Sequence, residues 1–228
     1  MTNPDFATLA DWRRRIADLY ASVREIATSD PQLAWIQWRR VRDELYRVHP
    51  QSPVPADGRS AFQGRYWPYD PAFRFEVQIR TSDPGPAAPA DVDVLGGGSV
   101  PARGAGPAMH LPMSSGDAMT FARIGEVRVP LPQGPRTLGL FWMAGYAGGL
   151  FLPFRDDTNG SHTYGAGRYL LDAAKSADLG TAGATDRLIL DFNFAFQPSC
   201  AFDPQWSCPL APPENRLDVP IEAGERIR

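Results

Sequence analysis

The chain has 228 residues, of which 43% are hydrophobic and 21% charged, with a formal net charge of −3 and a pI near 5.6. A chain of this length buries about two-thirds of its unfolded surface as one domain and is short for two. The small negative charge gives no basic field over the molecule, which argues against nucleic acid as the main partner.

The basic residues are almost all arginine, and Lys175 is the single lysine. Because this excess runs through the whole chain, it indicates a compositional bias rather than an adaptation to bind anions. We therefore infer no binding site from isolated arginines.

Neither a secretory signal nor a membrane span is predicted. Residues 1–6 are polar, residues 13–15 are three arginines inside a helical pattern, and no apolar signal core is present. No window approaches the roughly 18 apolar residues that cross a bilayer. We expect a cytoplasmic protein without membrane contact, in which the two cysteines are thiols rather than a disulfide.

Residues 1–50 predict an N-terminal arm of two helices. Asp30 as N-cap, Pro31 at the first helical position and Pro50 as a stop delimit the second helix. Apolar residues at steps of three and four mark the first helix: Leu9, Trp12, Ile16, Leu19, Tyr20, Val23 and Ile26. The predicted apolar face of the second comprises Ile36, Val41, Leu45 and Val48, widened by Trp35 and Trp38. We expect the tryptophans to pack the arm onto the main domain.

Residues 51–228 predict an antiparallel β domain, because short alternating runs are separated by glycine and proline. The predicted strands are residues 73–79, 119–129, 136–143, 150–155, 164–171, 188–196 and 217–221. A turn is expected at 131–135, and Asn159–Gly160 is a strong hairpin signal. Residues 82–119 are rich in Pro, Gly and Ala with little apolar periodicity, so we expect a flexible loop. The predicted fold class is α+β, a helical arm packed on an antiparallel β-barrel or bent β-sandwich.

The strand at 188–196 suggests a ligand-binding wall. Alternation places Leu190, Phe192, Phe194 and Phe196 on one face, and Asp191 and Asn193 on the other. A carboxylate and an amide among small or apolar neighbours fit a pocket wall, while an ordinary half-exposed strand is an equal alternative.

The neighbouring hairpin offers charges that complement Asp191. Arg155 and Asp156 end one predicted strand, and Tyr164 and Arg168 flank the start of the next. We expect Asp191 and Asn193 to face the same cavity as Arg168. Glycines at 165 and 167 allow close approach of a ligand or backbone, with a bulge or bend as the structural alternative.

A rigid proline-rich stretch then presents Glu214, Asn215 and Arg216. The tripeptide suits a ligand clamp, because it offers hydrogen-bond donors and acceptors together, and it equally suits a lid salt bridge. If Asp191 and Glu214 face one cavity, they form an acid and base pair of the kind hydrolases use.

Cys200 and Cys208 lie in a proline-stiffened loop. A structural zinc site needs four ligands, and the three histidines, at 49, 110 and 162, fall at no ligand spacing, so we predict no metal. A nucleophilic cysteine needs a base, and His162 serves only if its turn folds over the loop. A tight turn at 202–206 would bring the sulfurs close enough to pair.

Several segments together resemble a bacterial and archaeal family known as domain of unknown function 1684 (DUF1684). They are Val48-His-Pro50, Phe62-Gln-Gly64, Tyr69-Asp-Pro-Ala-Phe-Arg-Phe75, residues 151–170, residues 190–217 and Ile221-Glu-Ala-Gly-Glu225. The resemblance covers nearly the whole chain. The family has no established activity, so the resemblance implies no reaction and no cofactor.

We therefore expect a β domain that binds a small polar ligand. The predicted pocket is lined by Arg155, Asp156, Tyr164, Arg168, Asp191, Asn193, Glu214 and Asn215. The alternatives are a hydrolase using Asp191 and Glu214 or, less favoured, a thiol-dependent enzyme using Cys200 or Cys208.

Overall fold

The computed structural model describes residues 3–81, 108–144, 148–183 and 186–227. Helices α1 (Asn3–Ile26) and α2 (Pro31–Val48) come first. The strands are β1 (Arg65–Tyr66), β2 (Arg74–Arg80), β3 (Ala108–Pro112), β4 (Ala118–Leu131), β5 (Gly134–Met143), β6 (Gly149–Phe154), β7 (Arg168–Asp172), β8 (Arg187–Asp191) and β9 (Glu225–Arg226). Of the described helices, none has the length and apolar character that crossing a membrane requires.

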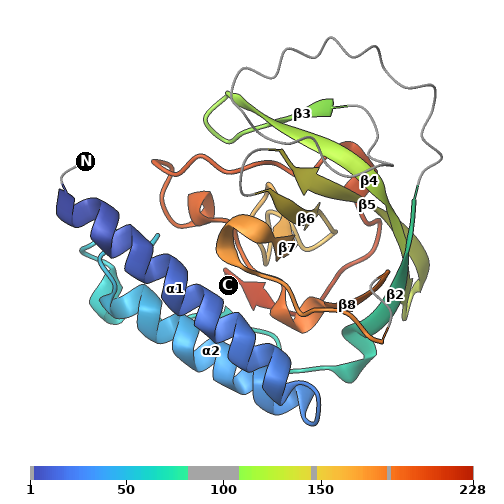
Figure 1. Ribbon diagram of the computed structural model, residues 1–228, viewed down its shortest axis with the longest axis horizontal. Coiled ribbons are helices and arrows are strands. Elements are labelled where there is room, and N and C mark those ends of the chain that lie inside the picture. Colours follow the sequence, from blue (N-terminus) through green and yellow to red (C-terminus); the bar gives the residue numbers. More distant parts are fainter. Residues whose placement is uncertain (1–2, 82–107, 145–147, 184–185, 228) are drawn as a thin grey trace.

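Most strands form one antiparallel sheet in the order β7-β6-β5-β4-β2-β8, with β3 added on β4. The sheet curls into a half-barrel, and α1 and α2 lie along one side of it (Figure 1). Strands β1 and β9 form a separate antiparallel ribbon. The predicted α+β class is confirmed, with mostly antiparallel β structure after the two helices.

The packed face of helix α2 is confirmed at Trp35, Trp38 and Leu45 but differs from the prediction elsewhere. Its N-cap is as expected, with Asp30 Oδ1 accepting from the Leu33 amide at 2.9 Å. Ile36 and Val48, however, are 48% and 64% exposed. The buried residues are Ala34, Trp35, Trp38, Arg42, Leu45 and Tyr46. Large aromatic rings bury more apolar area than Ile or Val, so the tryptophans set the packed face.

The expected role of these tryptophans is confirmed. The Trp38 ring lies 5.3 Å from that of Phe194 and the Trp35 ring 5.8 Å from that of Tyr69, centroid to centroid. They belong to a cluster of buried residues that joins both helices to the sheet. A second cluster joins other residues of the sheet to the C-terminal segment, including Leu217 and Ile221.

The strand predicted at 188–196 ends at Asp191. Residues Phe192–Phe194 form a 3₁₀ turn, capped by Asp191 Oδ1, which accepts from the Asn193 amide at 3.0 Å. Such a side-chain cap competes with the hydrogen bonds of a strand ladder. The predicted row of aromatic residues on one face is therefore wrong: Phe192 belongs to the sheet-side cluster, and Phe194 to the cluster under the helices.

Part of the predicted loop at 82–119 is β structure. Residues 82–107 lie outside the described residues, but β3 occupies Ala108–Pro112 and β4 begins at Ala118. Among the described residues, strand β3 pairs only with strand β4, and Leu111 is the one buried residue of β3. An edge strand that buries one side chain shows little apolar periodicity, which explains why it was missed.

The remaining strand boundaries also differ from prediction near the C-terminus. Residues 217–221 are not a strand, and the terminal strand is β9, paired with β1. Gly224 precedes it with φ +80°, and an added Cβ would lie 2.6 Å from the carbonyl oxygens of Phe192 and Ala195. Only glycine fits this close backbone approach. Likewise β7 begins at Arg168 rather than residue 164, after a turn containing Asn159 and Gly160.

Candidate functional site

Asp191 and Asn193 are buried and bonded to protein groups. Asp191 Oδ2 accepts from Arg74 at 3.3 Å and from the Tyr69 hydroxyl at 3.4 Å, and its Oδ1 accepts from the Asn193 side chain at 2.8 Å. Asn193 also exchanges hydrogen bonds with the backbone of Asp70. Burial raises the pKa of Asp191, against the opposing effects of Asn193 and Arg74. The arginine beside this carboxylate is thus Arg74 and not the predicted Arg168.

Arg168 holds the C-terminal segment in place. Its guanidinium is fully buried, pairs with Asp156 at 3.0 Å, and donates to the carbonyl oxygens of Ile221, Ala223 and Glu225. Asp156 is equally buried and caps the amides of Thr158 and Ile221. Among the described residues, no hydrogen bond or ion pair joins Arg168 to Asp191 or Asn193, and each of the three side chains has other protein partners.

A third group of predicted pocket residues lies beside strands β4 and β5 and comprises Glu214, Asn215 and Arg155. Glu214 pairs with Arg123 at 2.9 Å and is partly exposed. Asn215 is fully buried, exchanges hydrogen bonds with the backbone of Gly139, and donates to the carbonyl of Pro153 at 2.7 Å. The Arg155 amide donates to the Asn215 carbonyl. The tripeptide at 214–216 therefore ties its loop to the edge of β5, which matches the salt-bridge alternative better than a clamp.

Tyr164 lies beside the cysteines rather than beside Arg168. Its side chain is in hydrogen-bonding contact with the Cys200 thiol, and its amide donates to Gln197 Oε1 at 2.9 Å. His162, the predicted base, instead has its ring against Trp67. The predicted pocket residues thus fall into four separate groups, each with its own protein partners.

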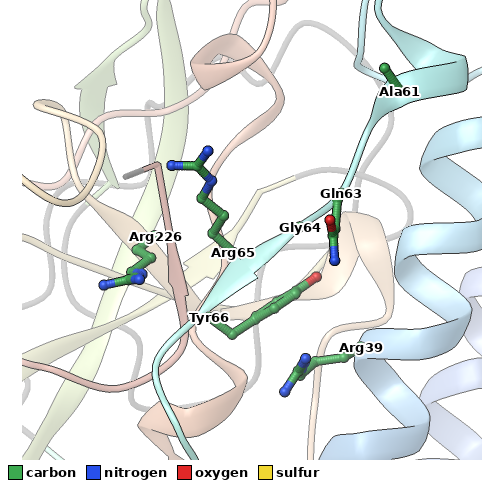
Figure 2. A pocket seen from close by; sticks show the side chains of 7 residues that line it. All are labelled: Arg39, Ala61, Gln63, Gly64, Arg65, Tyr66 and Arg226. Atoms are coloured by element: carbon green, nitrogen blue, oxygen red, sulfur yellow. The ribbon is translucent and has the colours of Figure 1, made fainter.

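A cavity that was not predicted lies where α2 meets the β1–β9 ribbon. Its volume is about 520 Å³, and its lining residues are Arg39, Ala61, Gln63, Gly64, Arg65, Tyr66 and Arg226. Figure 2 shows Arg65 and Arg226 extending from neighbouring strands, with Arg39 reaching from the helix beneath the ring of Tyr66. We call this the arginine cavity.

Two of the arginines face each other across the ribbon. Arg65 and Arg226 are direct partners in the antiparallel register of β1 and β9. Their side chains therefore leave the ribbon on the same face and lie close together. Like charges directly opposite each other destabilise a strand pair. The ribbon thus places two positive charges together at an energetic cost.

Arg39 is held by aromatic rings. Its guanidinium carbon lies 4.3 Å from the ring centroid of Trp35 and 4.7 Å from that of Tyr66. The Tyr66 hydroxyl donates to Asp43 Oδ1 at 2.8 Å, which fixes the ring. Cation–π contacts of this kind orient a guanidinium and leave its N–H edge available.

None of these three arginines forms an ion pair with a described residue. The Nε atoms of Arg39 and Arg226 are buried without a hydrogen-bond partner, although the same is true of Arg42 and Arg168. The cavity arginines differ from Arg42 and Arg168 in another respect. Arg42 and Arg168 each pair with a carboxylate, whereas the cavity arginines have no carboxylate partner among the described residues. Its lining residues carry positive charge only.

The described residues contain no group of three or more His, Cys, Asp or Glu side chains placed to hold a metal ion. Positive lining charges also disfavour a cation in the arginine cavity. The charged side chains that line this cavity are all guanidinium groups.

A family model described as "Protein of unknown function (DUF1684)" matches residues 60–226. The chain belongs to the DUF1684 family. A solution NMR structure of an uncharacterized protein of Haloarcula marismortui is similar: it shares 27% identity over 83% of this chain and 90% of that chain, with a TM-score of 0.56. No curated protein matches. The match includes Arg65 and Arg226 but begins after Arg39.

Sequence reasoning missed the arginine cavity for a definite reason. Arginine is so frequent in this chain that a single arginine carries little signal, and β1 and β9, with two residues each, are too short to show alternation. Their pairing joins residues 65 and 226, far apart in the chain. A usable signal was present in the aromatic neighbours of Arg39 and Arg65 at positions 35, 66 and 67.

Proposed function

We propose that this protein binds a small anionic molecule, carrying phosphate or carboxylate groups, in the arginine cavity. The observation that carries the proposal is the arrangement of Arg39, Arg65 and Arg226, which come from three elements, line one cavity and form no ion pair with a described residue. A bound anion would offset the repulsion between Arg65 and Arg226 and so gain affinity from a cost already present in the fold.

The side chains suit such a ligand in geometry as well as charge. A guanidinium presents a planar fork of donors that matches phosphate and carboxylate oxygens. Arg39 is already oriented by Trp35 and Tyr66, so less freedom is lost when it binds. The volume of about 520 Å³ lies within the usual range for small-ligand pockets of roughly 300–1,000 Å³.

The proposal keeps the predicted class of function, binding of a small polar molecule, and moves the site. The hydrolase alternative gains no support, because Asp191 is buried against Arg74 while Glu214 pairs with Arg123. We place the protein in the cytoplasm as part of the same proposal, in keeping with two free thiols.

Calorimetric titration with pyrophosphate at low ionic strength tests the proposal, with citrate as the carboxylate probe. We expect the parent protein to bind at least one probe, and Arg39→Gln and Arg65→Gln each to weaken binding about tenfold, equivalent to about 1.4 kcal/mol. Arg128→Gln removes the same charge from an exposed position on β4 and serves as the control. Absence of binding by the parent, or equal weakening in the Arg128 variant, would contradict a specific site.

A further inference from the structure

The two cysteines form a contact that the anion-binding proposal does not use. Both are free and buried, with 7% of Cys200 and 5% of Cys208 exposed. The Cys200 amide donates to the Cys208 sulfur at 3.4 Å. Because that amide nitrogen is bonded to the Cα of Cys200, the two side chains lie within reach of each other.

The loop that bears the cysteines is fixed on both sides. Residues Ser199–Ala201 form a 3₁₀ turn that places Cys200. On the other side, the Cys208 amide donates to the Ser114 hydroxyl at 3.0 Å, and the Ser114 amide donates to the Cys208 carbonyl at 2.9 Å. The Tyr169 hydroxyl donates to the carbonyl of the next residue, Pro209. The thiols therefore meet in an ordered setting.

The surroundings favour one thiolate in the pair. The Cys208 thiol, and then the Ser114 and Tyr164 hydroxyls, hydrogen-bond to Cys200 and lower its pKa to about 6, against the opposing effect of burial. Lys175, the single lysine, adds a favourable charge. The same contact raises the pKa of Cys208. Burial raises the pKa of Tyr164 to about 12, so its hydroxyl keeps its proton as a donor.

We propose that Cys200 and Cys208 are a reversible dithiol–disulfide pair that is oxidised by a small hydroperoxide. Burial of both cysteines excludes bulky disulfide oxidants. A peroxide is small enough to reach the pair from the side of Ser114, which is exposed and accepts a hydrogen bond from the Cys208 amide. Cys200 is the attacking sulfur, because its contacts with the Cys208 thiol and the Tyr164 hydroxyl favour its thiolate form, while the Ser114 hydroxyl donates to the Trp206 carbonyl.

The chemistry proceeds in two steps. The Cys200 thiolate attacks one peroxide oxygen, the O–O bond breaks, and the hydroxide that leaves takes up a proton to become water, which leaves Cys200 as the sulfenic acid. The Cys208 sulfur then attacks the Cys200 sulfur, an S–S bond forms, and a second water departs with the thiol proton. Both thiols together lose two electrons and the peroxide gains them. A dithiol reductant reverses the reaction.

Hydrogen peroxide treatment of the parent protein, followed by intact-mass measurement and thiol titration after unfolding, tests the pair directly. We expect a mass lower by two hydrogen atoms, no remaining free thiol, and full recovery of both thiols with dithiothreitol. The chain has no other cysteine, so the count is unambiguous. Oxygen addition without disulfide formation, or two thiols still present after treatment, would overturn the proposal.

Two single variants assign the order of attack. Cys208→Ser should accumulate a sulfenic acid at Cys200 that dimedone traps, while Cys200→Ser should react slowly. The reverse pattern would overturn the assignment of Cys200. A bulky aromatic disulfide reagent should titrate the native parent far more slowly than the unfolded chain, and equal rates would overturn the argument from burial.

Tyr164→Phe tests the tyrosine as a positioning residue. We expect the pH profile of the peroxide reaction to shift to higher pH, because a donor to the thiolate is lost. The charged and titratable groups facing Cys200 remain Cys208 and Lys175, with Tyr169 beside Cys208. Well above the shifted midpoint the variant and parent should react at the same rate, and an unchanged midpoint would remove Tyr164 from the account.

Discussion

The buried arginines of this fold have carboxylate partners, whereas the arginines that line the cavity have none among the described residues. Arg42 is 5% exposed and pairs with Glu225 at 2.9 Å, and Arg168 is fully buried and pairs with Asp156 at 3.0 Å. Arg65 and Arg226, by contrast, face each other without a carboxylate partner among the described residues. A buried charge must be paired, whereas a charge at a cavity can be left for a ligand.

The two kinds of arginine meet at strand β9. Alternation along this strand turns Glu225 toward Arg42 and Arg226 toward the arginine cavity. Glu225 Oε2 also accepts from the Gln197 amide at 2.7 Å. The same carboxylate thus joins strand β9 to helix α2 and to the backbone at Gln197. Figure 1 shows this end of the chain between the helices and the sheet. The Arg42–Glu225 pair therefore links the two elements, α2 and β9, that carry the cavity residues Arg39 and Arg226.

Glu225→Gln should cause the largest change. It leaves Arg42 buried without a counterion, and breaking such a pair by removing one partner costs about 3 kcal/mol of unfolding free energy or more. Urea denaturation measures the loss. Glu222→Gln, the same substitution at an exposed position three residues earlier, is the matched control and should leave stability near that of the parent. Similar losses in both variants would show that the buried pair is not special.

Asp191→Asn should produce a smaller, pH-dependent change. Burial raises the folded-state pKa of Asp191 above its ordinary value of 3.8, so the folded chain binds this proton more tightly than the unfolded chain does. The parent therefore loses stability relative to the Asn variant as pH rises through the folded-state pKa. Denaturation at pH 4 and pH 6 should show this relative loss, of smaller size than that for Glu225→Gln. A relative gain for the parent would mean that Arg74 outweighs burial.

Arg65→Gln should have the smallest effect on stability, and with the opposite sign. Removing one of two like charges across the ribbon should raise the unfolding free energy by about 0.5 kcal/mol in anion-free buffer of low ionic strength. Arg128→Gln lowers the net charge equally at an exposed site and controls for general charge effects. A loss of 2 kcal/mol or more, as for a buried partner, would place Arg65 among the structural arginines.

The sequence predicted elements whose signal is local. The Asp30 cap with Pro31, the stripe of α1 and the alternation of β2 were all confirmed, because each depends on neighbours in the chain. The tight connection between β4 and β5 was confirmed for the same reason. Errors arose where a side chain bonded to its own backbone, as Asp191 does, or where an edge strand such as β3 buried almost nothing.

The candidate site was not predictable in this way. Pairing of Arg65 with Arg226 joins the two ends of the β region, and a two-residue strand has no periodicity to reveal it. The polar residues that the sequence singled out are instead mostly consumed by the fold. These residues are buried and bonded to protein partners: Asp156, Arg168, Asp191 and Asn215. The polar residues that the sequence singled out hold the structure together, whereas arginines that it did not single out line the candidate binding site.

The most direct test of the comparison measures the stability of the parent and Arg65→Gln with and without pyrophosphate. We predict that the parent gains stability as the anion is added, by an amount that follows its binding constant, because the anion binds only the folded state. Arg65→Gln should start at or slightly above the parent and gain little. If Arg65→Gln starts well below the parent, or if both proteins gain equally, the arginine cavity is not an anion site and its arginines are structural.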